Sequence, residues 1–132
     1  MSSSRAPIGA ASMELLWTLA PHCPAVVLEA NFRTHSDYER AKVRSLQADI
    51  VEVYCRISRE KASRRFAERA RQQRHHPAHV LTEMPPERMA EYEEPFALSP
   101  VIEIDTQTTV DIDALVNRIQ ALLPPGTLNS KL

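Results

Sequence analysis

Arginine side chains dominate the stretch of this sequence whose residue types and spacing could do chemistry. Residues 56–74 hold eight of the sixteen Lys and Arg residues in the chain and only two acidic residues. The apolar positions of the stretch follow helical spacing, at about 100° per residue, through Ala62, Phe66 and Ala70. Arg65 and Arg69 fall beside that apolar stripe, one helical turn apart. The stretch therefore predicts a basic helix with two arginines at the edge of its core face.

Two neighbouring guanidinium groups at such an edge indicate a site for an anion. The planar fork of an arginine matches the oxygens of a phosphate group, so phosphate is the anion that this spacing favours. Arg64 falls on the opposite side of the helix from the apolar stripe. A solvated surface helix accounts for the same spacing, because the charged residues of most basic helices face water. Both interpretations stay open at this point.

The overall composition restricts the class of partner. Hydrophobic residues make up 43% of the chain and charged residues 25%, as in ordinary globular domains. A chain of 132 residues suffices for one domain with a modest core. A net charge of −1 gives no general electrostatic attraction to polyanions. We therefore expect neither nucleic acid nor membrane among the partners.

The sequence also predicts a cytoplasmic protein. No apolar run approaches the ~20 residues that a membrane-spanning helix needs, and Glu14 interrupts the mildly apolar N-terminus, so no signal peptide is expected. Cys23 and Cys55 are isolated in the sequence. We expect both to be reduced and buried, as small hydrophobic residues of a cytosolic protein.

Three short apolar runs predict the strands of a sheet. They cover residues 25–30, 50–55 and 101–106, and their continuous hydrophobicity is typical of strands buried on both faces of a parallel sheet. Helical spacing and end signals predict helices over residues 11–20, 37–47, 58–74 and 110–123. Thr34 or Ser36 is the candidate N-cap of the second of these helices, and Ser58 is that of the third. Strands that alternate with helices predict an α/β fold with a parallel three-stranded sheet flanked by helices. We expect one domain over residues 11–123, a disordered N-terminus at 1–10 and a tail at 124–132.

The order of these elements resembles that of small P-loop kinases of the AAA-type ATP-binding group, with zeta toxins and chloramphenicol phosphotransferase as more distant relatives. The resemblance covers roughly residues 12–123 and corresponds to the C-terminal two thirds of such kinases. It depends on four motifs, which are Leu28-Glu29-Ala30-Asn31-Phe32, Arg65-x-x-x-Arg69, Arg74-His75-x-Pro77-x-His79 and Ile104-Asp105-Thr106. The resemblance implies an incomplete P-loop NTPase kinase-like fold.

The resemblance also implies a site and a reaction, the transfer of phosphate from ATP, with Mg²⁺, to a small-molecule hydroxyl. Arg65 and Arg69 would be the lid arginines that stabilise charge on the transferring phosphoryl group, with Arg64 as the nearest alternative. Asn31 matches a polar position near the phosphoryl acceptor, and Glu29 a position for acid/base chemistry or metal contact.

Asp105 and Thr106 match the segment of such kinases that passes the adenine ring. Structural roles are open as well for the residues beside strand ends. Glu29 and Asn31 could equally close a strand and cap a turn. For Asp105 and Thr106 the structural role is favoured over ligand contact, because Asx turns are common after strands. No metal site is expected at His75, His76 and His79, because Pro77 breaks the helical register between them and no cysteine is near.

One motif of the family is absent. A P-loop has the sequence Gly-x-x-x-x-Gly-Lys-Ser/Thr, whereas the two glycines of this chain are Gly9 and Gly126 and no glycine precedes a lysine. Three interpretations follow: a truncated kinase that is inactive alone, a domain whose sheet is completed by a polypeptide supplying the missing P-loop strand, or a domain that binds without catalysis. We favour the first, so whether this chain is an enzyme, and whether it binds ATP and Mg²⁺ itself, stays open.

The alternative function is a non-catalytic binding or protein-interaction domain that uses the basic helix at residues 58–74. RNA is disfavoured as its ligand, because Tyr54 and Phe66 are the only aromatic residues close to that helix and stacking platforms normally have more.

Overall fold

The computed structural model describes residues 6–72, 87, 90 and 92–126. These residues divide into two compact units. Unit 1 takes the described residues up to Leu28 together with those between Ser58 and Ala90, and unit 2 takes Glu29–Ile57 together with the described residues after Glu91.

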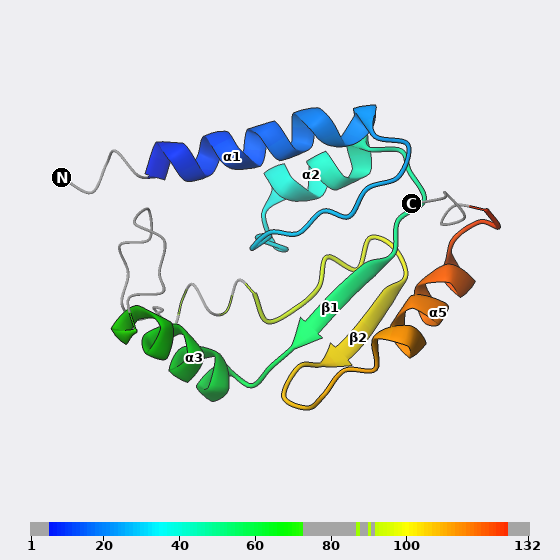
Figure 1. Cartoon of the computed structure of the whole chain (residues 1–132). Helices are drawn as coiled ribbons and strands as arrows, with labels where there is room; N and C mark the ends of the chain where they lie inside the picture. Colours follow the sequence, from blue (N-terminus) through cyan, green and yellow to red (C-terminus); the bar gives the residue numbers. More distant parts are fainter. Residues whose placement is uncertain (1–5, 73–86, 88–89, 91, 127–132) are drawn as a thin grey trace. The chain divides into compact units, whose positions relative to one another are not determined.

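Unit 2 contains a parallel pair of strands, β1 (Glu52–Arg56) and β2 (Val101–Asp105). They lie side by side with Val53 opposite Ile102 (Figure 1). The pair confirms the α/β class and the strands predicted at 50–55 and 101–106. Parallel strands need a long crossover between them, and residues 57–100 form the connection between the end of β1 and the start of β2.

The strand predicted at residues 25–30 is wrong. These residues are described, they form no strand, and the side chain of Val27 is 92% exposed. Hydrophobicity marks a segment that could be a strand, but a strand exists only where a neighbour takes up its backbone hydrogen bonds. Within the described residues the sheet has two strands rather than three.

The two faces of the strand pair differ. Residues opposite each other in a parallel pair share a face, so Val53 lies with Ile102, whose side chain is 1% exposed. The other face carries Glu52, Tyr54 and Arg56 from β1 with Glu103 from β2, and Arg56 forms an exposed ion pair with Glu103 at 3.8 Å. The prediction that the strands are buried on both faces is therefore wrong for this second face, which is polar and partly exposed.

Two capped helices complete unit 2, α2 (Asp37–Ser45) and α5 (Ile112–Leu122). The Ser36 hydroxyl accepts from the Glu39 amide at 3.3 Å, and the Asp111 carboxylate accepts from the Ala114 amide at 3.0 Å. Each side chain satisfies a backbone donor that the first turn of a helix leaves without an internal partner. Both helices confirm predicted segments, and Ser36 confirms one of the two candidate caps.

Unit 1 contains α1 (Ala6–Leu19), the 3₁₀ turn η1 (Ala20–His22) and α3 (Arg59–Arg71). The helix α1 begins five residues before its expected start. Trp17 of α1 and Ala20 of η1 are buried, whereas Ile8, Leu15 and Leu19 of α1 are exposed. Apolar residues therefore occur on more than one side of α1.

Both cysteines correct an expectation, because Cys23 and Cys55 are exposed free thiols rather than buried side chains. Cys55 follows Tyr54 near the carboxyl end of β1, so the two residues lie on opposite faces of the strand. Among the helices described, none combines the length and the apolar character required to cross a membrane.

Candidate functional site

The basic helix α3 is stabilised by its own polar residues. The Ser58 hydroxyl accepts from the Lys61 amide at 3.2 Å, and the Ala62 amide donates to the Ser58 carbonyl at 2.9 Å. Ser58 is thus the N-cap that the sequence predicts. Glu60 pairs with Arg64 at 3.9 Å, and such a pair four residues apart adds a few tenths of a kcal/mol to a helix (about 0.2–0.5).

Arg65 and Arg69 lie one turn apart on α3, and both are exposed. The Arg69 Nε donates to the Arg65 carbonyl at 3.4 Å. This contact lays the Arg69 side chain back along its helix, in the direction that helical side chains normally take. Phe66, between them in the sequence, is half-buried. The geometry therefore keeps two arginines next to one another beside the apolar side of the helix, as the spacing predicts.

Two further arginines of the helix contact acidic residues of the same helix. Arg64 contacts Glu60, and Arg71 forms an ion pair with Glu68, which also accepts from the side-chain amide of Gln72. These are exposed pairs, and each contributes little to stability. Their positive charge is nonetheless locally compensated. Arg64 is accordingly a weaker candidate for an external anion than Arg69.

Glu29 and Asn31 lie in the segment that opens unit 2, and both are exposed. Since residues 25–30 form no strand, the two side chains do not close one. Within the part of the chain that the structure describes, neither side chain makes a hydrogen bond or an ion pair. Their polar atoms face water and are available to a ligand.

Asp105 and Thr106 form a turn at the carboxyl ends of both strands. The Asp105 Oδ1 accepts from the Gln107 amide at 2.8 Å, and the Thr106 amide and hydroxyl both donate to the Arg56 carbonyl, at 3.0 and 2.9 Å. This is the Asx turn that the sequence left open as an alternative to adenine contact. The turn sits at the edge of the sheet where α/β proteins commonly bind ligands.

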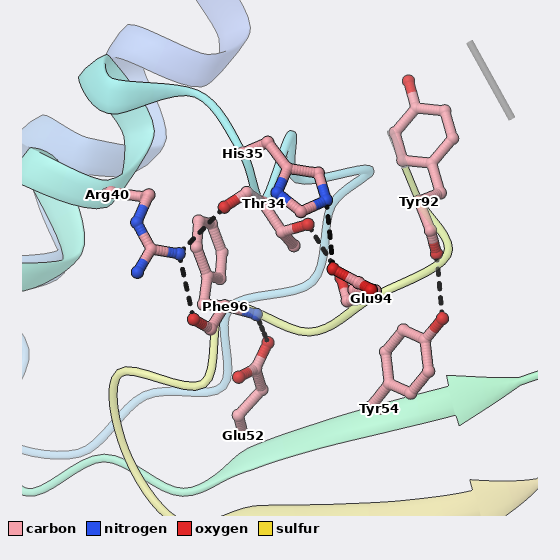
Figure 2. Close-up of polar contacts among 8 residues, drawn as sticks. All are labelled: Thr34, His35, Arg40, Glu52, Tyr54, Tyr92, Glu94 and Phe96. Carbon is pink, nitrogen blue, oxygen red and sulfur yellow. Dashed lines mark hydrogen bonds and ion pairs between the residues drawn. The ribbon is translucent and has the colours of Figure 1, made fainter. Parts of the chain in front are cut away.

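Unit 2 contains a cluster of polar contacts that the sequence patterns do not predict. It joins a loop at residues 32–35, here called the recognition loop, to an irregular segment at residues 92–97, here called the strap (Figure 2). The Thr34 hydroxyl donates to the Glu94 carbonyl at 2.7 Å, and His35 lies 3.4 Å from the Glu94 carboxylate. Arg40 Nη1 donates to the carbonyls of Thr34 and Phe96, both at 3.0 Å.

The strap is also attached to β1. The Glu52 carboxylate accepts from two successive amides, that of Phe96 at 2.8 Å and that of Ala97 at 3.0 Å. Ala97 has a φ of 55°, a left-handed conformation that is uncommon outside glycine and asparagine. Two successive backbone N–H groups beside a left-handed residue form a concave site that binds anions. Here the anion is the chain's own carboxylate.

Tyr54 provides a second attachment on the same face of β1, because its hydroxyl donates to the Tyr92 carbonyl at 3.0 Å (Figure 2). Burial raises the pKa of the Tyr54 phenol above its usual value of 10.0, and the negative charges of Glu103, Glu93 and Glu94 raise it further. The Arg56 charge opposes this shift. Tyr54 is therefore kept in its neutral, hydrogen-bond-donating form.

One signal in the sequence could have pointed to this cluster. Glu52 interrupts the apolar run Ile50–Cys55, and a polar side chain inside a strand requires a hydrogen-bond partner. Its partners are 44 and 45 residues away, so no local pattern identifies them.

The structure thus divides the predicted site residues between the two units. Arg64, Arg65 and Arg69 belong to unit 1, whereas Glu29, Asn31, Asp105 and Thr106 belong to unit 2. His75, His76 and His79 lie outside the described residues. Among the residues that are described, no three His, Cys, Asp or Glu side chains gather as a metal site would require.

Comparison with protein-family models gives no match to this chain, and neither curated proteins nor solved structures match it.

Proposed function

We propose that the chain is a P-loop kinase-like, ATP-binding protein in which α3 contacts the phosphates through Arg65 and Arg69. The observation that carries this proposal is that Arg65 and Arg69 are both exposed and lie four residues apart in α3, on adjacent turns. Arg69 Nε also donates to the Arg65 carbonyl at 3.4 Å. Two such groups can contact oxygens of one oligophosphate by charge-assisted hydrogen bonds. In kinases, arginines of this kind stabilise the charge of the transferring phosphoryl group.

Unit 2 has further roles in this proposal, by resemblance to the same kinases. Asn31 contacts the small-molecule hydroxyl acceptor, and Glu29 is an oxygen ligand for Mg²⁺ or a base for that hydroxyl. A single carboxylate fits Mg²⁺, because this ion usually takes one or two carboxylates together with phosphate oxygens. The turn at Asp105 and Thr106 contacts the nucleotide base in this proposal, as the matching segment of such kinases does.

Phosphoryl transfer requires in addition a Gly-x-x-x-x-Gly-Lys-Ser/Thr loop, which this sequence lacks. We propose that a polypeptide supplying such a strand and loop pairs with β1. Among the described residues β1 has one neighbour, β2. A two-stranded sheet is marginal on its own, and an unpaired edge is a template for another strand. The proposed location is the cytoplasm, where ATP is abundant and where the exposed thiols of Cys23 and Cys55 stay reduced.

The proposal is tested by titrating the ¹⁵N-labelled chain with Mg–ATP and following the NMR signals of backbone amides and arginine Nε groups. Two arginine contacts without a phosphate-binding loop predict a Kd in the millimolar range (about −4 kcal/mol), which is too weak for calorimetry. We expect saturable shifts at Arg65 and Arg69. Unshifted arginine signals up to 20 mM (roughly an upper limit for this weak class of binding) would contradict the proposal.

A second function is favoured by a separate observation. The arginines Arg64, Arg65, Arg69 and Arg71 are all exposed, although contact with one oligophosphate needs only one side of the helix. An acidic protein partner would use more of this surface. Titration with poly-glutamate distinguishes the two functions, because it would shift the signals of all four arginines, whereas ATP would shift mainly those of Arg65 and Arg69.

A further inference from the structure

The recognition loop (residues 32–35) and the strap (residues 92–97) hold each other through contacts that are long-range in the sequence. Thr34 and Glu94 are 60 residues apart, and Arg40 and Phe96 are 56 residues apart. The rings of Phe32 and Phe96 add an aromatic contact, with centroids 5.7 Å apart and tilted by 56°, a favoured arrangement for such pairs. The Thr34 hydroxyl, the Arg40 guanidinium and the Phe32 ring thus all contact the strap.

Single groups take part in several of these contacts, so the contacts depend on one another. Phe96 donates its amide to Glu52, offers its carbonyl to Arg40 and packs its ring against Phe32. Arg40 Nη1 bridges a carbonyl of each segment. Movement of either segment away from the other would therefore break the Arg40 bridge, the ring contact and the Thr34 bond at once.

The recognition loop is also held from its other side by a buried carboxylate. Glu39 is 8% exposed, and its Oε2 accepts from the Arg33 amide at 2.6 Å. A buried charge is costly unless hydrogen bonds compensate it, so this bond is strong only while the loop stays closed. Thr34, at 6% exposure, is buried at the same place. Opening of the loop would expose both polar groups to water.

We propose that the recognition loop and the strap open and close as one conformational unit, and that the closed state fixes the chain directly after Asn31. Local openings of this kind occur in contiguous cooperative units with free energies below that of global unfolding. The joint opening does not depend on the proposed kinase-like function. Where that function applies, a ligand of Asn31 would favour the closed state, since it would bind that state more tightly.

The proposal is tested by native-state hydrogen exchange of the full chain. The readouts are the Arg33 amide in the recognition loop, the Phe96 and Ala97 amides in the strap, and the amides of the β1–β2 ladder as a reference for global unfolding. Thr34→Val removes the hydroxyl and leaves the Glu94 carbonyl without that donor. In the unmodified chain we expect Arg33, Phe96 and Ala97 to share one opening free energy, lower than that of the ladder amides. In Thr34→Val we expect exchange at these three amides to accelerate together, by about tenfold.

Thr106→Val is the matched control, because it removes a threonine hydroxyl that also donates to a carbonyl in unit 2, at 2.9 Å. It should leave the three reporting amides within twofold of the unmodified chain. Acceleration at Arg33 without the strap amides, or the reverse, would overturn the proposal. An opening free energy at these three amides equal to that of the ladder amides in the unmodified chain would also overturn it, because the opening would then be global. The same response to Thr106→Val would overturn it too, because the effect would not be specific to the recognition loop and the strap.

Discussion

The carboxylate of Glu52, in the first residue of β1, accepts from the Phe96 amide at 2.8 Å and from the Ala97 amide at 3.0 Å. The backbone of Glu52 also donates to the Pro100 carbonyl at 2.9 Å, just before β2 begins. One residue therefore sets both the start of the strand register and the path of the strap. Its replacement should affect stability more than its position on the polar face of β1 would indicate.

We predict that Glu52→Ala lowers the free energy of unfolding by about 2 kcal/mol, because two amides lose a charged acceptor. Glu52→Gln keeps one acceptor oxygen and should lose about half as much. Urea denaturation measures both values. Glu103→Ala is the control, since its exposed pair with Arg56 at 3.8 Å should contribute less than about 1 kcal/mol. Equal losses for Glu52→Ala and Glu103→Ala would contradict the role of Glu52.

The apolar face of the strand pair supports a second prediction. Ile102 is 1% exposed, so Ile102→Ala removes buried methylene groups and leaves a cavity, at a cost of about 2–5 kcal/mol. Ile112→Ala makes the same change at a residue that is 61% exposed and should cost less than about 1 kcal/mol, since little apolar surface is lost from the core. Thermal unfolding followed by circular dichroism compares the two. A similar fall in Tm would show that β2 is not packed as described.

Tyr54 makes stability depend on alkaline pH. Its folded-state pKa is raised above 10.0, by burial and then by neighbouring carboxylates, so the unfolded chain loses this proton first as the pH rises. The stabilising contribution is complete below pH 10 (about the pKa of an unfolded tyrosine) and is lost as the pH rises through the folded-state pKa.

The phenolate absorbance of the folded chain, minus that of Tyr54→Phe, should therefore titrate with a midpoint above that of free tyrosine. Tyr54→Phe should also remove the bond to the Tyr92 carbonyl, at a cost of about 1 kcal/mol at neutral pH. A difference titration with its midpoint at or below the ordinary tyrosine value would show that the phenol is neither buried nor near the acidic side chains.

Local patterns predicted the parts of the fold that local chemistry determines. The sequence predicts Ser58 as a cap and Ser36 as one of two candidates, because a capping hydroxyl bonds within three residues of itself. The strands at 50–55 and 101–106 were recognised from their apolar runs. The run at 25–30 has the same character, and it failed as a strand because pairing depends on a neighbour that hydrophobicity does not reveal.

The contacts of the strap could not be predicted from the sequence, since they join residues such as Thr34 and Glu94 across 60 positions. The left-handed Ala97 gives no signal either, because alanine is not a residue that usually marks this conformation. For the candidate site, helical spacing predicted that Arg65 and Arg69 are neighbours. The same spacing places Glu60 four residues before Arg64 and Glu68 three residues before Arg71, so these two pairs could have been predicted from the sequence as well.

The central claim is that Arg65 and Arg69 bind the phosphates of ATP, and a comparison of two charge-matched double variants tests it most directly. Arg65→Ala with Arg69→Ala removes the proposed ligands. Arg64→Ala with Arg71→Ala removes the same number of positive charges from the same helix and also frees the acidic partners of those arginines. General attraction of ATP to a basic helix would therefore weaken at least as much in the second variant as in the first.

The affinity for Mg–ATP is measured for both variants by NMR titration at constant ionic strength, with helix content checked by circular dichroism. We predict that the variant lacking Arg65 and Arg69 binds at least tenfold more weakly than the unmodified chain (roughly the loss of one charge-assisted hydrogen bond). The variant lacking Arg64 and Arg71 should change less than threefold (about 0.7 kcal/mol). Equal losses in the two variants, or no loss in the first, would contradict the claim.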